Sequence, residues 1–65
     1  NISMFGDNLK NLRIASNITQ KELAKMLNVS YKSISHWESN YSEPSFSLLT
    51  KLKNILKCSY EDLLE

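Results

Sequence analysis

The side chains that could carry out catalysis are few in this 65-residue chain, and they lie far apart. There is one histidine, His36, and one cysteine, Cys58, with seven scattered carboxylates. This set gives no nucleophile–base pair and too few soft ligands for a structural zinc site. The single glycine excludes a glycine-rich phosphate cradle. The sequence therefore predicts no enzyme, metal or cofactor, unless it is part of a longer polypeptide whose other domain does chemistry.

A second kind of chemistry is hydrogen bonding from the surface of a short helix. At about 100° per residue, Ile34 and Trp37 fall on one side of a helix, and Lys32 and His36 fall on the other. Lysine and histidine can donate to the O6 and N7 atoms of guanine. The alternative is an ordinary solvated helix face. Trp37 could stack on unpaired bases, but its spacing with Ile34 favours a place in the core.

Two short helices must position these side chains. Thr19 followed by Glu22 is a capping box that begins one helix. Asn28 can adopt the left-handed conformation that ends it, and Ser30 can cap the next helix. Two helices of about two turns joined by a tight corner are a helix-turn-helix, which usually lays its second helix in the DNA major groove.

The rest of the chain also has a helical pattern, so we expect an all-α fold. Helices are predicted from Met4 to about Ser16, from a cap at Ser45 to about Lys57, and in a final turn after Ser59. The predicted architecture is a compact bundle of five short helices in one domain, residues 4–65. Residues 1–3 are interpreted as left from cloning or as a disordered or altered start. The side chains expected to point inward are Phe5, Leu9, Leu12, Phe46, Leu49, Leu52 and Leu56.

Size and charge fit a small binding module. The net charge is +1 and the pI is near 8.1, so one copy should bind DNA phosphates weakly. Acidic residues cluster near the C-terminus, which leaves the first fifty or so residues more basic. No apolar run is long enough for a membrane span and no signal peptide is recognisable, so a cytoplasmic setting is expected.

The central segment resembles the lambda-repressor-like (Cro/CI-type, XRE) helix-turn-helix family. The resemblance rests on Gln20, Glu22-Leu23-Ala24, Leu27, Val29-Ser30, Ile34-Ser35, Trp37-Glu38 and Pro44. It extends from Leu9 to Leu64, nearly the whole chain. The family pattern often has glycine where this chain has Asn17 and Asn40, and asparagine also tolerates the left-handed conformation.

What the resemblance implies can be assigned to residues of this chain. Arg13 is expected to form a partly buried ion pair with Glu38, although an arginine on a first helix is usually solvated. Base contacts are expected from Tyr31, Lys32, Ser35 and His36. Phosphate contacts are expected from Gln20, Lys21, Ser30, Ser33, Ser39, Asn40 and Tyr41. In relatives the loop before Pro44 is commonly basic, whereas this loop carries Glu43, which we expect to point away from DNA.

An excess of apolar side chains remains near the C-terminus. Leu48, Ile55, Leu63 and Leu64 suggest a patch left for a partner, and in relatives this region often forms the two-fold dimer contact. Fraying of the chain end is the alternative. The resemblance therefore implies a homodimeric transcription regulator, most often a repressor, that reads a palindromic double-stranded operator. The modest charge and Glu43 keep open an alternative, a protein-interaction module such as an antitoxin subunit or regulatory adaptor.

Overall fold

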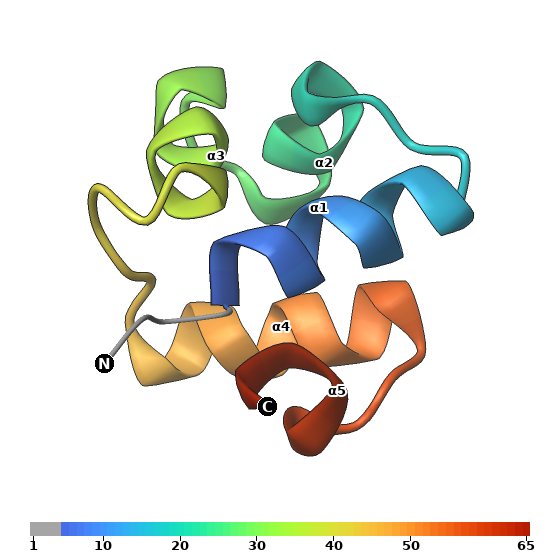
Figure 1. Ribbon diagram of the computed structural model, residues 1–65. Coiled ribbons are helices and arrows are strands. Elements are labelled where there is room, and N and C mark those ends of the chain that lie inside the picture. The colour runs from blue at the N-terminus through green and yellow to red at the C-terminus, as the bar shows by residue number, and fades with distance from the viewer. Residues whose placement is uncertain (1–4) are drawn as a thin grey trace.

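The computed structural model describes residues 5–65, which form five helices and no strand. They are α1 (Phe5–Ala15), α2 (Gln20–Leu27), α3 (Tyr31–Glu38), α4 (Phe46–Leu56) and α5 (Tyr60–Leu64). Figure 1 shows α2 and α3 at the top, α1 across the middle, and α4 and α5 below. Helix α1 contacts α3 and α5, and α2 contacts α3 and α4. The predicted all-α bundle is confirmed; the expectations for residues 1–3 and Met4 lie outside the described residues.

The helix starts follow the predicted capping pattern. The Thr19 hydroxyl accepts from the backbone N–H of Glu22 at 3.0 Å, and the Glu22 carboxylate accepts from the N–H of Thr19 at 2.8 Å. These bonds satisfy two of the backbone donors that a helix start leaves unpaired. The other caps are Ser30 for α3, Ser45 for α4, and Ser59 with Asp62 for α5.

Three of the four left-handed residues are the asparagines that the sequence indicated. Asn17, Asn28 and Asn40 have φ angles of 61°, 59° and 63°. Their short polar side chains make this conformation less costly than it is for most residues. Lys57, at the end of α4, also has a positive φ of 55°, and its side chain gives no signal that predicts it.

One apolar core lies between the helices. Trp37 is 5% exposed, which confirms the core interpretation over base stacking. Ala24 is buried where α2 passes close to its neighbours, as its small side chain allows. The remaining buried apolar residues are Phe5, Leu9, Leu23, Leu27, Ile34, Leu52, Leu56 and Leu63.

Phe46 does not point inward, contrary to the prediction. It is 74% exposed, and its ring stacks on Tyr60 with centroids 6.0 Å apart. Six residues along a helix turn by about 600°, so Phe46 lies about 120° around the axis from the buried Leu52. Leu48, only about 40° from Leu52, packs against the core instead.

Leu63 is a core residue rather than part of an exposed patch, so this part of the predicted partner surface is wrong. It is fully buried, and the Asn8 side chain donates to its carbonyl at 3.0 Å. The reason is the position of α5 against α1, which covers this side of the turn. Leu64, the next residue, remains 52% exposed.

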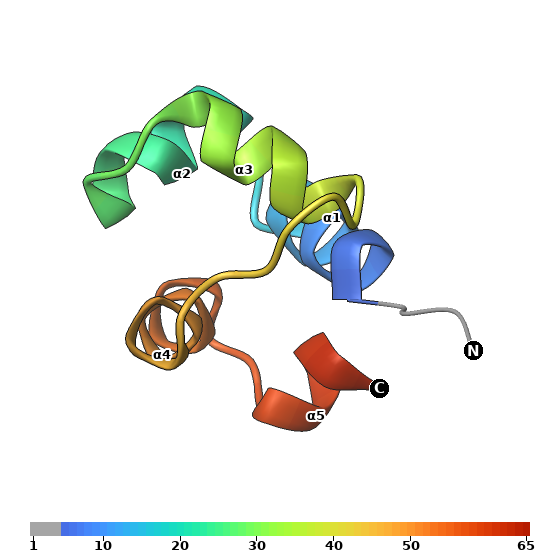
Figure 2. The ribbon, with the colours of Figure 1, turned by 90° about the vertical axis from the view of Figure 1, so that its left-hand side faces the viewer.

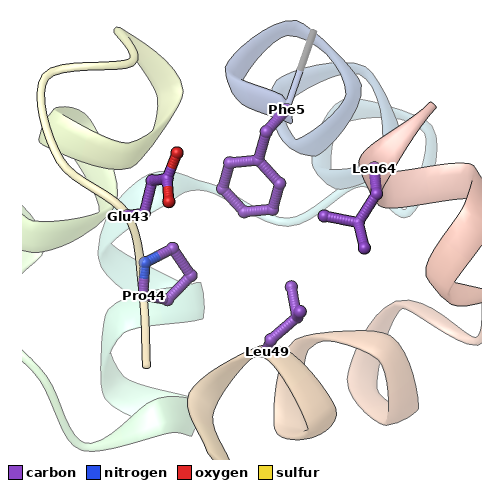
Figure 3. A pocket seen from close by; sticks show the side chains of 5 residues that line it. All are labelled: Phe5, Glu43, Pro44, Leu49 and Leu64. Atoms are coloured by element: carbon purple, nitrogen blue, oxygen red, sulfur yellow. The ribbon is translucent and has the colours of Figure 1, made fainter. Parts of the chain in front are cut away.

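A small hollow lies beside Leu64. Figure 3 shows it between the start of α1, the loop before α4, and helices α4 and α5. Its volume is about 120 Å³. Glu43 is the one charged residue among those that line it, which are Phe5, Glu43, Pro44, Leu49 and Leu64.

Gly6 lies where α1 comes close to the end of α3. A Cβ atom at this position would lie 2.4 Å from the Glu38 carbonyl oxygen and 2.9 Å from the Asn40 side chain. The Gly6 N–H also donates to the Asn40 carboxamide oxygen at 2.9 Å. Gly6 is therefore required because the two backbones meet, and not because of a turn.

The ion pair between Arg13 and Glu38 joins the same two helices. Arg13 Nε donates to Glu38 Oε2 at 2.5 Å and Nη2 donates to Oε1 at 3.1 Å, while only 9% of Arg13 and 8% of Glu38 is exposed. Arg13 Nη1 also donates to the carbonyl of Ile18 at 2.9 Å. The predicted pair is present, and it fixes the position of α3 on α1.

Cys58 is half-buried and packs against the core. Burial raises the pKa of its thiol, the nearby Asp62 raises it further, and Lys53 lowers it. A raised pKa disfavours the reactive thiolate, which agrees with a packing role.

We expect Gly6→Ala to destabilise the fold by about 1–3 kcal/mol, because the new methyl group overlaps the Glu38 carbonyl and forces the helices apart. Alanine is a better helix former than glycine by about 1 kcal/mol, so a loss of stability in Gly6→Ala would point to the overlap with the Glu38 carbonyl. Urea unfolding followed by circular dichroism measures it, with the exposed Lys10→Ala on the same helix as the control. Stability equal to or above that of the unmodified chain would contradict the assignment.

We expect Glu38→Gln to lower the free energy of unfolding by about 3–5 kcal/mol, since it leaves the Arg13 guanidinium buried without a counter-charge. Glu43→Gln, a change at an exposed carboxylate, is the matched control. The double variant Arg13→Met/Glu38→Gln should be more stable than Glu38→Gln alone because no charge is then stranded. A double variant no more stable than the single would refute this explanation.

Candidate nucleic-acid interface

The outer side of α3 carries the predicted base-contacting side chains. Ile34 is fully buried and Trp37 nearly so, and they hold α3 against α1 and α2. This leaves Tyr31 and Lys32 exposed at the start of the helix, with Ser35 and His36 half-buried further along it. Helix α3 lies at the outer edge of the molecule in both ribbon views (Figures 1 and 2). The helix therefore presents a polar edge that a flat or grooved partner can reach.

Lys21 of α2 lies next to the start of this edge. Its Nζ atom is 5.8 Å from the centre of the Tyr31 ring, within the range of a cation–π contact. Both residues are exposed. The contact joins the first turns of α2 and α3 into one basic, aromatic corner.

Gln20 is not simply an exposed residue at a helix start. Its side-chain Nε2 donates to Oε1 of Glu38 at 3.0 Å. The residue is half-buried, so the buried ion pair orients its carboxamide. No local sequence pattern predicts this bond, because it joins residues that are 18 positions apart.

Several predicted phosphate ligands already take part in hydrogen bonds at the two ends of α3. The hydroxyls of Ser30 and Ser33 lie 3.1 Å apart, and the Ser39 hydroxyl donates to the His36 carbonyl at 3.1 Å. A serine hydroxyl can donate once and accept twice, so these groups are oriented by their local bonds. Asn40 accepts from Gly6, so its carboxamide is held against α1.

The loop after α3 returns to the middle of the polar edge. The centroids of the Tyr41 and His36 rings are 4.7 Å apart, and the rings are tilted by 50°. The Tyr41 N–H donates to the His36 carbonyl at 2.9 Å, which holds the loop there. Tyr41 is 78% exposed, so most of its surface faces solvent.

Sequence reasoning missed the role of Gly6 and the contact between Tyr41 and His36, although both of the latter residues were predicted to contact DNA. Gly6 carries a signal, since it is the only glycine of the chain, but its partner helix could not be known. The contact between Tyr41 and His36 leaves no local pattern in the sequence.

Within residues 5–65, no group of three or more His, Cys, Asp or Glu side chains is placed to hold a metal ion. None of the helices in this part of the chain is long and apolar enough to cross a membrane.

Comparison with known proteins adds to this geometry. The pattern of the helix-turn-helix family matches residues 9–63. The chain is 36% identical over 62 residues to the SPbeta prophage-derived uncharacterized HTH-type transcriptional regulator YonR of Bacillus subtilis (strain 168). That match covers 95% of this chain and 57% of the relative, so the chain spans little more than half of its length.

Two solved structures have the same fold. The c2 repressor of Salmonella phage P22, in complex with a synthetic operator, is 36% identical with a TM-score of 0.87, covering 94% of this chain and 92% of that one. SinR, a master regulator for biofilm formation, in complex with DNA, is 30% identical with a TM-score of 0.85, covering 95% and 100%. With the matched family pattern and the observed arrangement of α2 and α3, this chain belongs to the lambda-repressor-like helix-turn-helix family.

Proposed function

We propose that this chain binds double-stranded DNA with α3 in the major groove and regulates transcription in the cytoplasm. The form of regulation that we propose is repression. The side chains that read bases are Tyr31, Lys32 and His36, with Ser35 at the margin. Lys32 donates to guanine O6 and N7, and His36 has a ring N–H for the same acceptors. Two subunits bind a palindromic operator, with their α3 helices about 34 Å apart, one turn of DNA.

The observation that carries this proposal is the exposed polar edge of α3, which Ile34 and Trp37 hold outward from the core. Support comes from the P22 c2 repressor in complex with an operator and from SinR in complex with DNA, both similar to this chain over nearly its whole length. The phosphate contacts are proposed for Gln20, Lys21, Ser30, Ser33, Ser39, Asn40 and Tyr41.

The two-fold contact is proposed for the side of α4 and α5 around Leu48, Ile55 and Leu64. Leu64 is half-exposed and borders the hollow of Figure 3, while Leu48 and Ile55 are partly buried at the edge of the core. A net charge of +1 gives a single copy little attraction for phosphates, so affinity depends on two half-sites bound together.

A second candidate is a protein-interaction module of the same fold. It is favoured by Ile14 and Met26, which are 55% and 57% exposed, and by the open hollow that Ile18 and Met26 help to line. A stable protein partner that contacts Ile14 and Met26 and prevents DNA binding would support this candidate over the first.

Selection of bound sites from random duplex DNA, followed by titration of the selected duplex, tests the DNA-binding proposal. We expect a palindromic site, a binding curve that steepens with protein concentration, and affinity that falls as salt rises, because counterions are released from phosphates. Sedimentation on the same samples reports whether two subunits bind. The absence of any salt-dependent binding at micromolar protein would refute the proposal.

We expect Lys32→Ala and Gln20→Ala to weaken binding in different ways. Lys32→Ala should lower discrimination at one base pair by about 1–3 kcal/mol, since a base contact is lost. Gln20→Ala should weaken all duplexes equally because a phosphate contact carries no sequence information. Competition with single-base variants of the selected site measures both. Lys51→Ala, an exposed lysine on α4, is the control; a preference changed equally by all three variants would contradict the assignment.

A further inference from the structure

We infer that Tyr41 is a positioning residue for His36, so that a loop residue outside α3 sets the base preference of the helix. The inference rests on the proposed DNA-binding function, because it concerns how the polar edge of α3 reads a base pair. It assigns to Tyr41 a role distinct from direct phosphate contact.

The first observation is the ring contact. The centroids of the His36 and Tyr41 rings are 4.7 Å apart and the rings are tilted by 50°. Aromatic pairs favour separations of about 4.5–7 Å in tilted or offset arrangements. His36 is only half-buried and lies on the outer side of α3, so core packing does not fix its ring. The ring contact with Tyr41 is therefore a restraint on the imidazole from outside α3.

The second observation is how the loop is held. The His36 carbonyl oxygen accepts from the N–H groups of Tyr41 and Ser42 at 2.9 and 3.4 Å, and from the Ser39 hydroxyl at 3.1 Å. Three donors from the loop therefore converge on the backbone of the residue whose side chain Tyr41 contacts. The loop cannot move relative to α3 without breaking these bonds, so the backbone of Tyr41 stays beside His36, within reach of the ring contact.

The consequence concerns the readout of a base pair. An imidazole must present its ring N–H within a narrow angle to donate to a base edge or to a phosphate. A free histidine side chain loses rotamer freedom when it binds, whereas one already held in place loses less. Tyr41 thus increases the discrimination that His36 provides, with no contact to the base itself.

Substitutions can separate a direct phosphate contact of the Tyr41 hydroxyl from the contact of its ring with His36. Tyr41→Phe removes the hydroxyl that could bind a phosphate and keeps the ring, while Tyr41→Leu removes both. The base pair read by His36 is identified as the one at which His36→Ala loses discrimination on the selected duplex. Ser42→Ala, which keeps the backbone donor of the same loop, is the matched control.

We expect Tyr41→Phe and Ser42→Ala to keep the base preference at that pair, and Tyr41→Leu to lower it by about three- to tenfold, because the His36 ring is no longer held. The double variant His36→Ala/Tyr41→Leu should discriminate no worse than His36→Ala alone, since the effect acts through His36. The NMR signals of the His36 ring protons, measured without DNA, should shift in Tyr41→Leu and not in Ser42→Ala.

Other results would overturn the inference. Tyr41→Leu could weaken binding equally to duplexes that carry each of the four base pairs at this position, or the losses of discrimination in the double variant could be additive. Either result would assign Tyr41 to phosphate contact or loop stability. Unchanged His36 ring signals in Tyr41→Leu would show that the ring contact is absent. If the unmodified chain selects no duplex, the proposed function fails as a whole; normal binding with an unchanged preference in Tyr41→Leu refutes this inference alone.

Discussion

The buried pair of Arg13 and Glu38 is the constraint on which the arrangement of the first three helices depends. Removing two charges from water is favourable only if nearly all of their hydrogen-bonding atoms find partners. Here the guanidinium binds the carboxylate by two bonds and the carbonyl of Ile18 by a third, and Gln20 supplies another donor to Glu38. Helices α1, α2 and α3 must therefore keep one mutual position, and that position sets which side of α3 faces outward.

The polar side of α3 is largely organised before any partner binds. Serine hydroxyls at both ends of the helix are bonded to each other or to the backbone, and the loop after α3 is bonded to the His36 carbonyl. Side chains held in this way lose less freedom on binding. This compensates in part for the low charge of the chain, which provides little long-range attraction for phosphates.

The sequence predicted the features that depend on neighbours three or four residues apart. The capping serines, the Thr19–Glu22 box and the inward direction of Ile34 and Trp37 are of this kind, and the family resemblance added the Arg13–Glu38 pair. Phe46 and Leu63 were assigned wrongly because their burial depends on where α4 and α5 pack. The bond from Gly6 to Asn40 spans 34 positions, and local patterns hold no information about it. The DNA-contact residues themselves stay predictions.

Asn40 shows why an average of related sequences would be a poor guide to redesign at this position. Its φ of 63° suits glycine, which the family commonly has there, and glycine would adopt this conformation with no side-chain cost. However, the Asn40 carboxamide also accepts the N–H of Gly6 in the first turn of α1, where a helix has no internal acceptor. It thus caps a remote helix from a turn. A consensus replacement would preserve the backbone geometry and remove that cap.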